Sequence, residues 1–172
     1  SSRQTRPVGS NLGVYFEPVG GLPLPWATGD IGTVGTDGAA TLDGTTFTVA
    51  GAGAGIADAA DAFRFVYRQG PRWTAGGGPA ARLRTQTGGA GAVAGVMVRD
   101  DRSSDVTSPG SRFAFVGRRG DGRAVANWRT NTRGKIATAT SVAGVPLDSR
   151  FRIRRTNLYV WSIEYSTDGT SW

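Results

Sequence analysis

Short runs in which apolar and polar residues alternate, separated by glycine-rich turns, restrict the fold of this chain more than any other feature. Phe63, Phe65 and Tyr67 take every second position of one run, and Phe151 and Ile153 do so in another. Side chains of an extended strand point to opposite faces in turn, so each run places its apolar groups on one face. Such runs, spaced by glycine-rich and Asp-Gly turns, predict the antiparallel strands of a sandwich or barrel.

Composition supports the same fold class. The chain has 27 glycines, few good helix formers, and many valines and threonines, which favour strands. We therefore predict an all-β fold with strands near residues 46–49, 62–68, 80–85, 93–99, 112–116, 123–129, 151–155 and 158–166. The last of these has apolar groups on both sides at its start, which predicts a central position in its sheet.

Two absent residue types exclude much chemistry. The chain has no cysteine and no histidine, so it cannot form a Ser-His-Asp or Cys-His nucleophile system, a zinc site of the usual kind or a disulfide. Hydrolysis by paired carboxylates is also disfavoured: Glu164 is the only glutamate of the strand-rich region, and we expect it to face outward and pair with Arg152 or Arg154. We predict that the protein is not an enzyme.

Three aspartates suggest calcium, the only cofactor that the sequence brings forward. Asp100, Asp101 and Asp105 crowd a loop directly after a predicted strand, and calcium prefers such hard oxygen ligands. Their spacing does not follow an EF-hand. The favoured alternative is a solvated loop in which the carboxylates neighbour Arg99 and Arg102.

Two other patterns receive structural interpretations. Asp58 and Asp61, just before the 62–68 strand, are expected to accept hydrogen bonds from backbone N–H groups of a turn. Residues 89–94 match a loose G-x-G-x-x-G/A pattern, but a predicted strand follows instead of the helix that a pyrophosphate site requires. Neither pattern indicates a ligand.

The net charge of +7 is concentrated in one part of the chain. Residues 112–155 hold eleven basic and two acidic residues. A basic strip attracts polyanions, so nucleic acid is a partner to consider, although the least favoured one. The favoured interpretation is that alternating arginines form the solvated face of a sheet.

Aromatic residues near predicted loop ends suggest a carbohydrate surface. Trp73 and Trp128 lie beside arginines, and exposed indole rings can stack on sugar rings. We predict ligand contacts at Trp73, Trp128, Arg129 and Arg99. Trp161, on an alternating strand, is expected in the core.

The first 25 residues differ from the rest. They hold four of the eight prolines and predict a tail or linker before a domain at residues 26–172. Within this tail Leu12, Val14 and Phe16 alternate along a potential strand. No run of 18 apolar residues is present, so no membrane-spanning segment is predicted.

Five segments in this order and spacing resemble a bacterial family of concanavalin A-like β-sandwich modules, similar to laminin-G-like and regulation-of-enolase-like jelly rolls. They read WATGDIGTVG, FTVAGAG, ADAFRFVY, AGVMVRD and YSTDGTSW, and lie between residues 26 and 172. The resemblance implies a jelly-roll sandwich of two antiparallel sheets. It also implies a non-catalytic module of the kind found in extracellular and cell-surface proteins beside glycoside hydrolases.

Two function hypotheses follow. The first is an extracellular or cell-surface binding or adhesion module for polysaccharide or another surface partner. The second is a structural subunit that forms a homo-oligomer or fibre by strand exchange: members of the similar family continue past the last turn with a further strand, and its absence would expose a sheet edge. Leu12, Val14 and Phe16 could then complete the sheet of a neighbouring copy.

Overall fold

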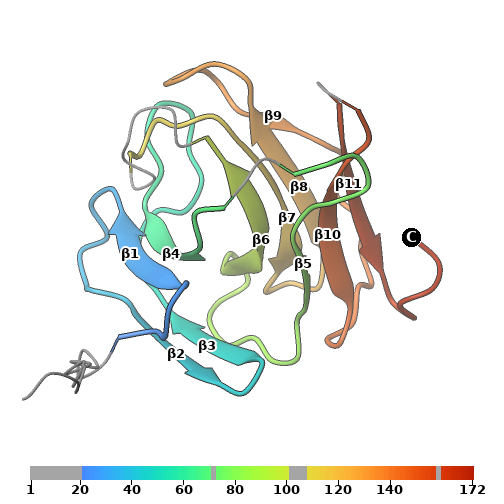
Figure 1. Cartoon of the computed structure of the whole chain (residues 1–172). Helices are drawn as coiled ribbons and strands as arrows, with labels where there is room; N and C mark the ends of the chain where they lie inside the picture. Colours follow the sequence, from blue (N-terminus) through green and yellow to red (C-terminus); the bar gives the residue numbers. More distant parts are fainter. Residues whose placement is uncertain (1–20, 71–72, 101–107, 158–159) are drawn as a thin grey trace, which may run out of the picture.

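The structure is a computed structural model of the chain that describes residues 21–70, 73–100, 108–157 and 160–172 (Figure 1). Within these residues it contains strands and no helix. The strands are β1 (Ala27–Ile31), β2 (Ala39–Asp43), β3 (Thr46–Ala50), β4 (Phe63–Tyr67), β5 (Ala80–Arg82), β6 (Val93–Arg99), β7 (Phe113–Arg119), β8 (Ala124–Arg129), β9 (Ala137–Thr138), β10 (Arg150–Arg155) and β11 (Trp161–Ser166). The prediction of an all-β fold is confirmed.

Hydrogen bonding groups the described strands into four antiparallel sheets. The largest has the order β6-β7-β8-β9, and a three-stranded sheet has the order β11-β10-β5. The pairs β1-β4 and β2-β3 form two smaller sheets. In Figure 1 the large sheet occupies the middle of the molecule, with β10 and β11 on one side and β1 to β4 on the other.

Each of the eight predicted strands overlaps an observed one, whereas β1, β2 and β9 have no predicted counterpart. These three read ATGDI, AATLD and AT, so they consist mainly of small residues and show no apolar alternation. Pairing with β4, β3 and β8 makes them strands. The partner of β1 is distant along the chain, so the local sequence carried little signal for it, whereas β2 forms a hairpin with β3 about the Gly44 turn and its Asp-Gly signal was missed.

The core lies between the two largest sheets. Phe151 pairs with Tyr165, and Ile153 with Ile163, so the apolar face of the β10-β11 hairpin is continuous. Phe151 and Ile153 are almost fully buried, and burial of such side chains contributes roughly 1.5–3 kcal/mol each. The buried core residues are Val96, Val116, Ala124, Val145, Phe151 and Ile153. Trp161 packs against them, as predicted.

The opposite face of the hairpin is polar. Arg152 Nε donates a hydrogen bond to Glu164 Oε2, and Arg154 Nη2 lies 3.6 Å from Glu164 Oε1, so the predicted cross-strand pairing is confirmed. The predicted central position of the last strand is wrong. Among the described strands β11 lies at the end of its sheet. Val160, just before β11, is 50% exposed, because only one face of this strand packs on the core.

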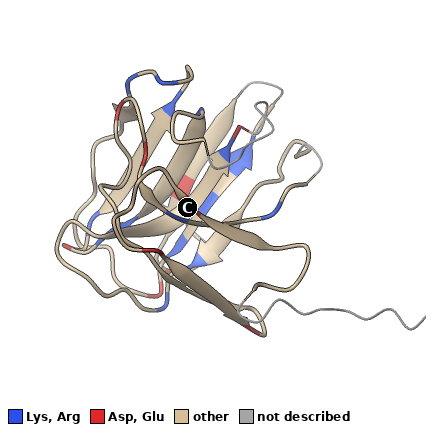
Figure 2. Cartoon of the chain, turned by 90° about the vertical axis from the view of Figure 1, so that its left-hand side faces the viewer, with Lys and Arg blue, Asp and Glu red and all other residues tan. Residues whose placement is uncertain are grey.

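The basic residues of segment 112–155 do not form one exposed strip. Arg129 is buried, Arg112 binds Asp100, and Arg118 donates to Gln86 and to a backbone carbonyl. Figure 2 shows basic residues on several strands and loops. Much of the positive charge is therefore used within the protein.

The N-terminal predictions fall mostly beyond the described residues. Leu12, Val14 and Phe16 lie there. Leu22, which belongs to the predicted tail, is only 8% exposed. A search of the described part of the chain for a helix with the length and apolar character needed to span a bilayer found none.

Candidate functional site

Three strand ends meet at one edge of the large sheet. Arg99 at the end of β6 pairs with Phe113 at the start of β7, and Phe113 pairs with Arg129 at the end of β8. Antiparallel neighbours bring the end of one strand beside the start of the next. The connections that leave these strands are therefore adjacent.

A buried carboxylate lies beneath these connections. Asp61 Oδ1 and Oδ2 accept hydrogen bonds from Arg129 Nη2 at 2.7 Å and Nη1 at 3.0 Å. Asp61 Oδ2 also accepts one from Arg99 Nη1 at 2.8 Å. The exposed fractions of the Asp61, Arg99 and Arg129 side chains are 0%, 2% and 0%. We call these three residues the Asp61 cluster.

Further donors of the two guanidinium groups, Arg99 Nη2 and all three nitrogens of Arg129, bind backbone carbonyl oxygens. Arg129 Nη1 donates a hydrogen bond of 2.8 Å to the Ser111 carbonyl. Arg129 Nε donates bonds of 3.1 Å to the carbonyls of Asp58 and Gly134, which lie in two other loops. The acceptor residues are Ala57, Asp58, Ser108, Ser111 and Gly134. One carboxylate balances only one of the two guanidinium charges, and the partial negative charge of these carbonyl oxygens helps to offset the other. The same bonds hold three loops against the two arginines.

The Asp61 cluster corrects part of the predicted ligand set. Arg99 and Arg129 were expected on the surface, yet both guanidinium groups are inside the protein and bound to protein acceptors. Each also lies over an aromatic ring, with Arg129 Cζ 4.9 Å from the centroid of Phe113 and Arg99 Cζ 5.7 Å from that of Phe63. Neither side chain offers a surface to a ligand.

The prediction that Asp58 and Asp61 accept hydrogen bonds from N–H groups of their turn holds for Asp61 and is wrong for Asp58. Asp61 Oδ1 accepts a long bond of 3.4 Å from the Ala57 N–H, and Asp58 Oδ1 accepts one of 3.0 Å from the Ile136 N–H. The second donor is far along the chain, in the connection after β8. The principal role of Asp61, binding two arginines, was missed because nothing in the local sequence identifies such distant partners.

A hollow of about 400 Å³, lined by polar residues, opens to solvent beside the Asp61 cluster, and the carbonyls of two lining residues bind Arg99 and Arg129. Its volume lies in the usual range of ligand sites. Its walls come from the end of β6, the segment before β7 and the segment after β8. The lining residues are Asp100, Ser108, Ser111, Arg112, Thr130, Asn131 and Thr132. We call this surface the loop hollow.

The loop hollow offers one ion pair together with neutral donors and acceptors. Asp100 Oδ2 accepts a hydrogen bond from Arg112 Nε at 2.8 Å and a second from Arg112 Nη2. Both side chains are partly exposed. Hydroxyl groups and the Asn131 amide complete a lining that can hydrogen-bond a polyhydroxylated ligand.

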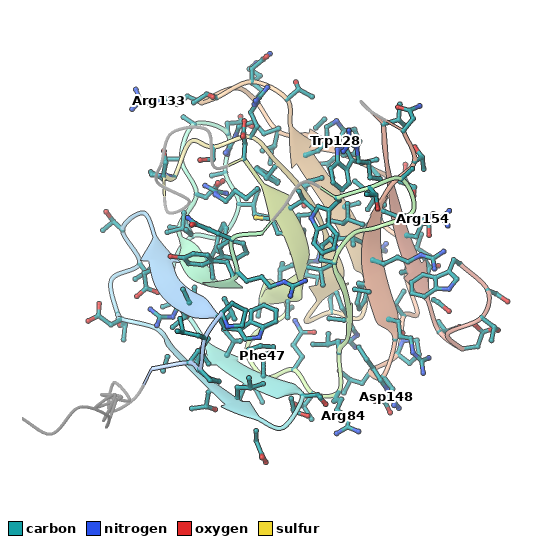
Figure 3. All side chains as sticks on the ribbon, viewed as in Figure 1. Phe47, Arg84, Trp128, Arg133, Asp148 and Arg154 are labelled. Atoms are coloured by element: carbon teal, nitrogen blue, oxygen red, sulfur yellow. The ribbon has the colours of Figure 1, made fainter. Side chains whose placement is uncertain are left out.

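Two walls of the loop hollow, the segment before β7 and the segment after β8, are hydrogen-bonded to each other. The Arg133 N–H donates to the Gly110 carbonyl at 2.8 Å, and a Cβ built on Gly110 would lie 2.6 Å from Arg133 Cγ. Arg133 has a φ of +56°, in the left-handed region that non-glycine residues adopt at an energetic cost, and sits at the outer tip of its loop (Figure 3). These contacts position the walls of the loop hollow before any ligand arrives.

The predicted calcium ligands are only partly described. The Asp100 carboxylate is engaged by Arg112, while Asp101 and Asp105 fall outside the described residues. Within the described ranges, no three histidine, cysteine or acidic residues gather as a metal site would need. Calcium binding stays a prediction.

Neither of the two predicted tryptophans is among the residues that line the loop hollow. Trp128 is partly buried and shares its face of β8 with the core residues Ala124 and Ala126 (Figure 3). Trp73 is also partly buried, and its ring lies 5.9 Å from Arg68 Cζ. The structure thus brings Arg99 and Arg129 together in the interior and places the tryptophans elsewhere.

Comparisons of the chain with protein-family models, with curated proteins and with solved structures found no match.

Proposed function

We propose that this chain is a non-catalytic, extracellular or cell-surface binding module directed at polysaccharide, and that it is a jelly-roll sandwich related to the concanavalin A-like family. The observation that carries this proposal is the loop hollow. Its ion pair, hydroxyls and amide match the donors and acceptors of sugar hydroxyl groups. The Asp61 cluster holds its walls in place, which lowers the entropy lost on binding.

The lining also supports binding without hydrolysis. Glycoside hydrolysis generally requires two carboxylates about 5–10 Å apart. Among the described residues that line the loop hollow, Asp100 is the only acidic one, and Arg112 binds it. This arrangement suits recognition of a sugar better than proton transfer to one.

A panel of neutral and acidic polysaccharides, tested with the full chain by array and pull-down, examines the proposal. Asp100→Asn is expected to weaken binding about tenfold, because a charged hydrogen-bonding group is lost. Asp121→Asn is the matched control: Arg119 binds Asp121 in a comparably exposed pair in the turn between β7 and β8, at the other end of these strands from the lining residues. Failure of every polysaccharide to bind, or equal losses in both variants, would contradict the proposal.

Assembly by strand exchange remains the second candidate, favoured by one observation. Among the described strands, the outer edge of β11 has no neighbour, and such edges pair readily. The proposed donors Leu12, Val14 and Phe16 lie outside the described residues. Light scattering of the intact chain and of a deletion of residues 1–20 tests this function: a stable monomer of the intact chain at high concentration would exclude it.

A further inference from the structure

Arg68, directly after β4, is an exposed arginine between two tryptophan rings. Its Cζ lies 5.7 Å from the ring centroid of Trp26 and 5.9 Å from that of Trp73. Within the described part of the chain its guanidinium makes no hydrogen bond or ion pair, whereas Arg64 on the same strand binds Asp30 at 3.0 Å. A cation–π contact orients the charge but uses none of the N–H donors, so these donors remain available.

Both rings are held by other parts of the fold. Trp26 packs edge-on against Phe47 of β3, labelled in Figure 3, with centroids 4.7 Å apart. The Trp73 carbonyl accepts a hydrogen bond from Arg155 Nη1, and the backbone of Arg155 pairs with Gly76 and Gly77 just beyond. Trp26, Arg68 and Trp73 are therefore positioned from three different sheets, without a ligand, and the two rings are only partly buried.

This surface has the chemistry of an acidic sugar site. The C–H groups of a pyranose ring stack on an indole, while a carboxylate on the same ring can take two N–H donors of a guanidinium. A neutral sugar would use the rings alone. The surface is also separate from the loop hollow, since Arg68 follows the end of β4 and Phe63, beside Arg99 of the Asp61 cluster, begins it.

We propose that Trp26, Arg68 and Trp73 form a second subsite, which binds a uronic acid unit of an acidic polysaccharide. The proposal rests on the polysaccharide-binding function above and names the class of ligand. Charge complementarity with Arg68, which has no ion-pair partner among the described residues, carries it. The loop hollow, whose own guanidinium already binds Asp100, takes neutral hydroxyl-rich units.

Calorimetry on the full chain with polygalacturonate and with its fully methyl-esterified form tests this subsite. The two polymers share a backbone, and only the first carries carboxylates. Arg68→Gln is expected to weaken polygalacturonate binding about tenfold and to leave binding of the ester within about twofold. Arg84→Gln, at another exposed arginine labelled in Figure 3, is the control for net charge and is expected to change both affinities less than about twofold.

The outcomes separate this inference from the proposed function. Unchanged polygalacturonate binding by Arg68→Gln, or an equal loss in Arg84→Gln, overturns the subsite while Asp100→Asn still reports on the loop hollow. Binding that depends on Arg68 but not on Asp100 supports the subsite and overturns the proposal that the loop hollow binds polysaccharide. Absence of binding to either polymer by a chain that binds other polysaccharides overturns the subsite alone, and absence of all polysaccharide binding overturns both.

Discussion

Two clusters in this protein each join one carboxylate to two arginines, one in the interior and one on the outer face of a hairpin. The Asp61 cluster joins one carboxylate to Arg99 and Arg129 in the interior. On the outer face of the β10-β11 hairpin, Glu164 joins Arg152 and Arg154, with side chains 19%, 26% and 43% exposed. We call these the Glu164 cluster. The comparison shows how burial, rather than the number of ion pairs, decides what a charged group contributes.

The physical reason is desolvation. Buried ions have lost their water, so each depends on its protein partners, and removal of one partner leaves an uncompensated charge. Exposed ions regain water when a partner is lost, and their attraction is weakened by solvent and salt. The Asp61 cluster should therefore be sensitive to every substitution, and the Glu164 cluster should tolerate them.

Asp61→Asn is expected to have the largest effect. It leaves the buried Arg99 and Arg129 without a counter-charge and should lower the free energy of unfolding by roughly 3–5 kcal/mol. For a domain of this size the melting temperature would fall by about 6–20 °C. Thermal and urea unfolding measure this change. A loss below about 1 kcal/mol would show that burial does not distinguish the clusters.

Arg129→Lys keeps the charge but not the geometry. An ammonium group cannot bind both Asp61 oxygens in a fork and reach the backbone carbonyls as well, so we expect a loss of about 2–4 kcal/mol. Urea unfolding of this variant beside Arg152→Lys gives the comparison. Equal stabilities of the two variants would mean that the forked geometry contributes nothing.

Glu164→Gln is expected to lower stability by no more than about 1 kcal/mol, since its partners are solvated. Repeating the unfolding experiments in about 1 M NaCl should remove most of this difference, because screening reaches exposed pairs, while the Asp61→Asn difference persists. Equal salt sensitivity of both differences would contradict the comparison.

The smallest predicted effect is a pH dependence of the Glu164 contribution. Burial raises the pKa of Glu164, but hydrogen bonds from Arg152 and Ser162 and the charges of Arg152 and Arg154 lower it by more, so its pKa lies below the usual value. The unfolded chain then binds a proton at higher pH than the folded one. The stability difference between wild type and Glu164→Gln should be constant above about pH 5 and shrink as the pH falls through about 4.3. A difference that grows with acidity would reverse the assigned direction of the pKa shift.

Local sequence was informative for the β10-β11 hairpin, where the partners are close along the chain. The run Phe151 to Arg155 alternates, so its apolar face, its arginine face and the pairing of Arg152 with Glu164, twelve residues away, could all be predicted. The candidate site could not. Arg129 has the local setting of an exposed loop-end arginine, and only Asp61, 68 residues away, makes it an interior group.

The sequence by itself determined the all-β fold, the strand faces and the exclusion of histidine and cysteine chemistry, because these depend on side-chain period and residue type. Tertiary structure alone decided that β1 becomes a strand, that two arginines are buried on Asp61, and that Arg68 lies between Trp26 and Trp73. Each of these requires residues distant in sequence to meet. Whether such contacts form depends on how well the geometry of the partners offsets the desolvation penalty of the buried groups, which no local pattern of residues records.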